Sequence, residues 1–204
     1  GVDVPLTLVD GTKRQAFTYA VPNQNQCAGC HATDAATRAI QPIGLKARHL
    51  NRSFPGAENQ LVRLKRLGYL DTAPANAPRN AVWTDASAPA EVRARSYLDI
   101  NCSHCHSPTG PARTSGLWLA TSVHDPRLLG ACKPPVAAGR GTGDRPYSIV
   151  PGRPDQSILA YRLASTDPGA MMPELGRALA HAEGVKLVEA YIAGLKGACE
   201  ATAQ

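Results

Sequence analysis

The chain carries the spacing Cys-x-x-Cys-His twice, at Cys27–His31 and at Cys102–His106. On a helix, two cysteines three positions apart share a face, where their thiols can form thioethers to the two vinyl groups of one porphyrin. The histidine that follows can then offer an imidazole nitrogen to the iron. The two copies use four of the six cysteines and two of the six histidines. We therefore expect two covalently bound haem c groups.

This interpretation assigns two roles to the motif residues. His31 and His106 would be the iron ligands, and the attachment residues would be Cys27, Cys30, Cys102 and Cys105. A Cys-x-x-Cys pair is also compatible with a thioredoxin-type dithiol or with half of a zinc site. A dithiol needs no histidine after it and normally lies in a βαβ unit, which neither copy shows. A zinc ion shared by the two pairs stays open as the alternative.

The second axial ligand largely sets what a haem does. Met171 and Met172 are the only methionines. We select Met172 for the second haem, because Pro173 stiffens the loop beside it, and expect Met171 to pack nearby. That both are core filler is the alternative.

The first haem has no methionine within residues 1–170. His49 is the only histidine between the two motifs and is our candidate ligand. Lys46, His124, His181 or an open iron are the alternatives. His104, inside the second motif, is expected to be exposed or to contact a ligand without ligating iron itself.

Composition and charge narrow the class of protein to which this chain can belong. Aromatic residues make up only 5% of the 204 residues, and two buried porphyrins would compensate for the missing core volume. Haem propionates would offset much of the net charge of +6, and no basic tract suited to nucleic acid appears. No apolar run is long enough to span a membrane.

Because this kind of haem attachment occurs outside the bacterial inner membrane, we expect a removed secretory signal and a periplasmic or otherwise extracytoplasmic location. There, Cys132 and Cys199 are expected to form a structural disulfide, with two free thiols as the alternative.

The apolar pattern predicts few regular elements. Alternation over residues 4–20 around Asp10-Gly11 predicts a β-hairpin with a type I′ turn. Helices are expected from Cys27 toward Ile40, over residues 57–67 with Gly68 as C-cap, from residue 88 or 89 to Cys102, and around residues 185–195. The Pro/Ala/Asn-rich residues 71–89 are the best domain boundary. We therefore predict a mainly α protein of two tandem cytochrome c-like domains, a reduced one at 1–89 and a complete one at 90–204, with a short N-terminal hairpin.

The second half is similar to a class I-like bacterial cytochrome c domain, through Tyr97 before its haem motif, Val150–Ser157 and Met172–Gly176. Together with Pro22–Cys27 and Cys132–Val136, the whole chain resembles a family of secreted bacterial dihaem c-type cytochromes. The resemblance implies a further β-rich region at the N-terminus. The abrupt start of this chain in a strand fits the loss of such a region.

Electron transfer is the function that these features favour. A haem with His and Met ligands and one with two His ligands would form a higher- and a lower-potential centre. Such a pair would carry electrons between periplasmic or membrane redox partners. The alternatives are a dihaem peroxidase or oxidase, which needs one open iron, and a cytochrome subunit of a larger oxidoreductase.

Overall fold

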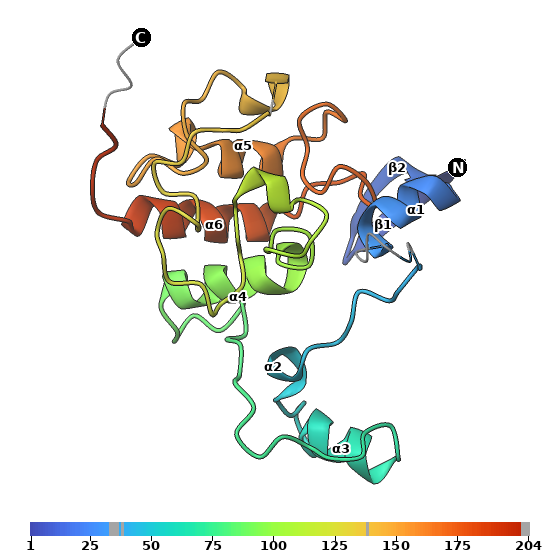
Figure 1. The fold of residues 1–204 in the computed structure, drawn as a ribbon. Helices are drawn as coiled ribbons and strands as arrows, with labels where there is room; N and C mark the ends of the chain where they lie inside the picture. Colours follow the sequence, from blue (N-terminus) through green and yellow to red (C-terminus); the bar gives the residue numbers. More distant parts are fainter. Residues whose placement is uncertain (33–36, 38, 138, 201–204) are drawn as a thin grey trace.

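The computed structural model describes residues 1–32, 37, 39–137 and 139–200, and among these it has six α-helices and one two-stranded antiparallel sheet (Figure 1). The strands are β1 (Val2–Asp10) and β2 (Lys13–Val21). The helices are α1 (Gln24–His31), α2 (Ala47–Leu50), α3 (Gln60–Arg66), α4 (Ala90–Cys102), α5 (Ile158–Ala164) and α6 (Ala182–Gly194). None of the described helices is long and apolar enough to cross a membrane.

The core is formed by α4, α5 and α6. Leu98 of α4, Leu163 of α5 and Val188 of α6 belong to one buried cluster, which the loop residues Leu119 and Ile149 complete. The apolar residues of α6 recur every three or four positions, so they form one stripe facing that cluster. The second Cys-x-x-Cys-His motif begins at the last residue of α4 and therefore continues directly from a helix of the buried core.

Residues 1–89 build no comparable core. Leu61 is the only buried hydrophobic residue among those described in this half. The hairpin pairs over nine residues in each strand, yet most of its side chains are exposed. The prediction of a mainly α protein with two tandem cytochrome c-like domains is therefore wrong. The protein is a small mixed α and β fold with long loops, because the apolar residues of the first half are too scattered to enclose a helical core.

Several individual elements match the sequence. The hairpin is confirmed, but its loop is Gly11-Thr12, with a positive φ at Gly11 only, so it is not the type I′ turn, which needs two such residues. The helix through Cys27 ends at His31; residues 39 and 40 are not helical, and residues 33–36 and 38 lie outside the described residues. The helix α3 begins at Gln60, three residues later than expected. The expected Cys132–Cys199 disulfide is present.

A buried carboxylate joins the two halves of the chain. Asp99 lies on α4 with no exposed side-chain surface, and both of its oxygens accept hydrogen bonds from the guanidinium of Arg48, each at 2.6 Å. His49 Nε2 lies 2.9 Å from Asp99 Oδ2, and Asn80 Nδ2 donates to the same oxygen at 2.7 Å. We call Asp99, Arg48, His49 and Asn80 the Asp99 network. It attaches α2 and the segment around Asn80, within residues 71–89, to the face of α4 next to the second motif.

The Asp99 network makes stability sensitive to acid. Burial alone would raise the pKa of Asp99, but hydrogen bonds from Arg48, Asn80 and His49 outweigh it and hold the pKa below the ordinary aspartate value. The carboxylate therefore stabilises the folded state fully above the unfolded pKa of about 3.9, and this contribution is lost as the pH falls from there toward the lower folded pKa.

We expect Asp99→Asn to lower the free energy of unfolding by about 3–5 kcal/mol at pH 7, because Arg48 would keep a partly buried charge without its partner. Urea unfolding followed by circular dichroism measures this loss, and the variant should lose less stability between pH 5 and pH 2 than the wild type does. Asp167→Asn is the control, since its ion pair with Arg140 is exposed and worth about 0–1 kcal/mol. Equal losses in the two variants would contradict this role for Asp99.

Candidate functional site: two cysteine–histidine motifs

The first motif lies on a helix whose start is fixed just before it. The Asn23 side chain accepts from the N–H of Gln26, and the Gln26 side chain accepts from the N–H of Asn23, both at 2.9 Å. This capping box begins α1 three residues before Cys27, so Cys27 and Cys30 lie one helical turn apart. Both thiols are free.

The imidazole of His31, the last residue of α1, has a defined tautomer. Its Nδ1 lies 2.8 Å from the main-chain carbonyl oxygen of Gln41. A carbonyl only accepts, so Nδ1 carries the proton and Nε2 keeps its lone pair. A metal-ligating histidine is normally held in this way, with one ring nitrogen donating to an acceptor and the other facing the metal.

The second motif continues the end of α4 as a tight turn. The N–H groups of Cys105 and His106 both donate to the carbonyl of Cys102, at 3.1 and 2.9 Å. The chain then folds back so closely that a Cβ at Gly110 would lie 2.2 Å from the Cys105 carbonyl oxygen. Only glycine fits at this position, and the loop after the motif is therefore held against it.

The imidazole of His106 has the same tautomer, set by a side chain. Its Nδ1 lies 3.3 Å from Ser115 Oγ, and this hydroxyl donates its only proton to the carbonyl of Ala112 at 2.7 Å. Ser115 can therefore only accept from His106, which leaves Nε2 with its lone pair. Burial, and after it the charge of Arg162, lower the pKa of His106, so the ring is neutral. In both motifs the Nδ1 of the histidine is held by an acceptor, an orientation suited to metal ligation through Nε2.

The thiols of the second motif are protonated. Burial first, and Cys105 second, raise the pKa of Cys102 to about 12, and burial followed by Cys30 raises the pKa of Cys105 to about 11. No three His, Cys, Asp or Glu side chains within the described part of the chain come together to hold a metal ion. The four thiols are therefore not arranged as a ready zinc site.

The methionine loop is fastened to α5 beside the second motif. The N–H of Met172 donates to the Arg162 carbonyl at 3.0 Å, and Arg177 donates to the same carbonyl at 3.1 Å. The positive charge of Arg162 lowers the pKa of His106, although less than burial does. The pKa of Cys105 is raised by burial, then by Cys30 and then by the negative charge of Glu174. The charges of Arg162 and Glu174 thus lie within electrostatic reach of the second motif. Met171 is buried in the protein, whereas Met172 is only partly covered.

His49 is placed differently from the predicted ligand set. Its side chain is only 9% exposed, and its Nε2 contacts Asp99. To ligate iron, this histidine would have to use Nδ1 or release Asp99. The ligand role of His49 stays a prediction, but the structure assigns its Nε2 a structural partner.

The alternative ligands are scattered. Lys46 Nζ donates to Ser103 Oγ at 2.9 Å. His181 precedes α6, and its Nδ1 lies 3.0 Å from the Tyr97 hydroxyl. The centroids of the His181 and Trp83 rings are 4.9 Å apart.

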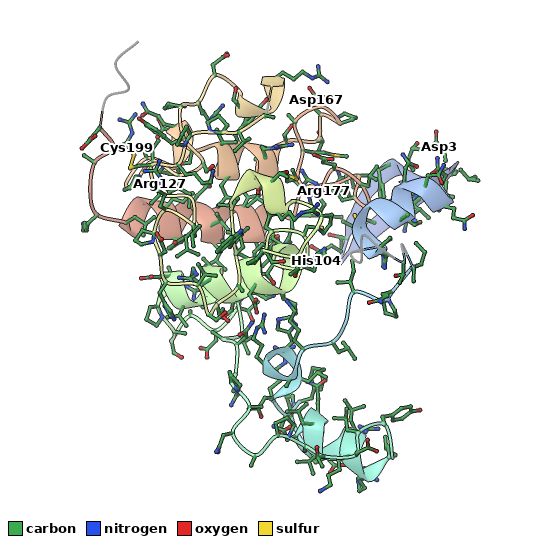
Figure 2. All side chains as sticks on the ribbon, in the orientation of Figure 1. Asp3, His104, Arg127, Asp167, Arg177 and Cys199 are labelled. Carbon is green, nitrogen blue, oxygen red and sulfur yellow. A yellow bond between two sulfur atoms is a disulfide. The ribbon has the colours of Figure 1, made fainter. Side chains whose placement is uncertain are left out.

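The two remaining histidines differ in exposure. His124 is exposed in a loop. His104 lies beside the end of α4 (Figure 2), half-buried, and its pKa is lowered by burial and then by Lys46 and His31.

The sequence interpretation missed the residues that support the site. The sequence did contain a signal for Asp99. This acidic residue directly follows the inward-facing Leu98 in a predicted helix, and a buried carboxylate needs hydrogen-bond partners. Ser115 and Gln41 had none, because a serine and a main-chain carbonyl nine and ten residues from their histidines gain their roles only through the folding of a loop.

The buried donors around the second motif suit a cofactor that bears carboxylates. Trp118 Nε1 and Arg177 Nε are buried without a hydrogen-bond partner in the described structure, as is His104 Nδ1. Buried polar atoms of native proteins nearly always have partners. Trp118 precedes Leu119, whose N–H donates to the His106 carbonyl at 3.0 Å, and Arg177 fastens the methionine loop. Haem propionates would satisfy such donors, so the residues present fit haem.

Comparisons with known proteins identify no relative. No protein-family model, no curated protein and no solved structure is significantly similar to the chain.

The Ser115 hydroxyl should tune a haem attached at the second motif. An acceptor at Nδ1 makes the imidazole more basic and favours ferric iron. We expect Ser115→Ala to raise the midpoint potential of that haem, by about 59 mV for each tenfold loss of preference for the ferric state. A spectroscopic redox titration measures the shift. Ser122→Ala, in an exposed turn, is the control, and a potential that moves equally in both variants would contradict the assignment.

Proposed function

We propose that this chain is a dihaem c-type cytochrome that carries electrons between periplasmic or membrane redox partners. The observation that carries the proposal is the repeated site: next to each pair of free thiols, a histidine donates from Nδ1 and keeps Nε2 free. A dithiol enzyme would have no need of such oriented imidazoles. Haem, when bound, supplies the one-electron chemistry, and the protein sets its potential and surroundings.

Each group of residues has a separate task in this proposal. The four free cysteines attach the porphyrins, and His31 and His106 ligate the irons through Nε2. Met172 is the second ligand of the haem at the second motif, which raises its potential. Arg162 and Arg177 hold the methionine loop against α5 and add positive charge near the second motif. The disulfide at Cys132 supports an oxidising, extracytoplasmic location.

The second axial ligand of the first haem decides between electron transfer and a second candidate function. Because Asp99 holds Nε2 of His49, an open iron at the first motif is compatible with the structure. An open iron would favour the peroxidase or oxidase alternative. His49→Ala separates the possibilities: conversion of one haem from low to high spin means that His49 is a ligand, whereas an unchanged spectrum with reduced stability means that it serves only the Asp99 network.

Expression together with a c-type maturation system tests the proposal. We expect two haems per chain by the pyridine haemochrome assay, both retained after denaturation because they are covalent. Replacing Cys102 and Cys105 with alanine should leave one. For an electron carrier, the reduced protein should not respond to carbon monoxide, nor the oxidised protein to peroxide. A colourless protein that binds zinc would refute the proposal, and a rapid peroxide reaction would favour the enzyme.

The two adjacent methionines provide a matched pair of variants. Met172→Ala should abolish the far-red charge-transfer band of a ferric haem with sulfur ligation and should lower the midpoint potential of that haem, because the thioether favours ferrous iron. Met171→Ala should keep the band and instead reduce stability, since Met171 is buried. Loss of the band in the Met171 variant alone would reverse the assignment.

A further inference from the structure

An apolar cavity lies in the first half of the chain, lined by α2, α3 and the segment that follows α3. Its volume is about 420 Å³, which is within the range of small-molecule sites. Figure 1 shows α2 and α3 on the side of α4 that faces away from α5 and α6. We call this feature the leucine cavity, after five of the residues that line it: Leu45, Leu50, Leu61, Leu64 and Leu70.

Hydrogen bonds hold the walls of the leucine cavity in place. The side chain of Asn51, just after α2, accepts from Asn59 Nδ2 at 2.9 Å and donates to the Ala77 carbonyl at 2.6 Å. After α3, the N–H of Tyr69 donates to the Leu64 carbonyl at 2.9 Å and turns the chain back along the cavity. The walls are therefore joined to one another, and the space between them does not depend on a ligand to form it.

The helix α2 is also fixed from its other side. Ala47 and Leu50 line the cavity, whereas Arg48 and His49, between them in the sequence, contact Asp99 of α4. The leucine cavity therefore lies directly behind the Asp99 network. None of the residues of the two motifs lines it.

The leucine cavity is open to water, although its lining is almost entirely apolar. Leu45 is 78% exposed and Tyr69 is 76% exposed, and Thr72 is the only polar residue of the lining besides Tyr69. Covering large apolar side chains that face water is favourable. A lining of aliphatic side chains with so few hydrogen-bonding groups selects an alkyl chain.

Positive charge is concentrated around this cavity. Residues 45–79 contain seven Lys and Arg against two Asp and Glu, a net charge of +5 out of +6 for the whole chain. Arg63 and Lys65 are exposed, and within the described part of the chain neither forms an ion pair or a side-chain hydrogen bond. On α3 they directly precede and follow Leu64, so they flank the stripe that lines the cavity. Their charges complement an anionic head group.

We propose that the leucine cavity binds a single-chain anionic amphiphile, with its alkyl chain against the leucines and its carboxylate paired with Arg63 and Lys65. The site is separate from both motifs and does not rest on the proposed function. Recognition has two parts, burial of the chain and neutralisation of the head group, and each part can be measured by itself.

The alkyl chain is tested by calorimetric titration of the full chain with octanoate, decanoate and dodecanoate, each below its micelle concentration. We expect the affinity to rise about fourfold for each added CH₂ until the cavity is filled. Thr72→Trp would fill the cavity from an exposed loop position and should abolish binding. Thr12→Trp, in the exposed hairpin loop, is the matched control. An affinity that does not depend on chain length, or that is equal in these two variants, would overturn the proposal.

The head group is tested with dodecyltrimethylammonium, a cation with the same alkyl chain as dodecanoate. We expect dodecanoate to bind about tenfold more tightly at low salt, because two exposed ion pairs form with the carboxylate. The double variant Arg63→Gln and Lys65→Gln should remove this preference. Arg127→Gln with Lys186→Gln removes the same charge at exposed positions elsewhere and should preserve it.

Two outcomes of the head-group experiment would overturn the assignment. One is an equal preference in the two double variants. The other is binding of the chain to phosphatidylglycerol vesicles without binding of monomeric dodecanoate, because the partner would then be a membrane surface and not a ligand within the cavity.

Discussion

The burial of the Asp99 carboxylate is the constraint on which the arrangement of this protein depends. A buried charge is tolerated only when its partners fully satisfy it, and here Arg48, His49 and Asn80 converge on it from segments far apart in the sequence. Because Asp99 lies three residues before Cys102, the same bonds that neutralise it bring the first half of the chain to the second motif. Among the described residues of 1–89 only Leu61 is a buried hydrophobic residue, so this network fixes α2 and Asn80 to α4 where hydrophobic packing is sparse.

The two motifs are alike in chemistry and different in support. At His106 the acceptor is a partly buried serine hydroxyl, within a loop that folds tightly against Cys105 at Gly110. At His31 the acceptor is the main-chain carbonyl of Gln41. His31 itself ends α1, a helix that has no buried residue. The second site is therefore the more rigid, and the methionine loop fastened by Arg177 adds to that rigidity. In the proposed cytochrome, this difference suits two haem centres with different potentials and different exposure to partners.

Sequence reasoning succeeded where the signal was local. The hairpin, α4 after Pro89 and the stripe of α6 follow from turn residues and apolar periodicity, and these elements are present. Failures came where an outcome depended on distant segments. Two similar motifs suggested two similar domains, but the apolar residues of the first half, such as Leu6, Leu8 and Leu45, stay exposed. The contact of His49 with Asp99 was likewise not visible in the pattern, and the ligand role of His49 stays a prediction.

The sequence by itself determined which residues can do chemistry: four thiols and two imidazoles at fixed spacing, two adjacent methionines and a remaining cysteine pair. These follow from covalent order, since a helical turn places residues three apart on one face whatever surrounds it. Only the tertiary structure decided the hydrogen-bond partners of His31, His106 and His49. Each of these depends on closing a long loop and satisfying a buried polar group, and only the assembled fold specifies where such groups find their partners.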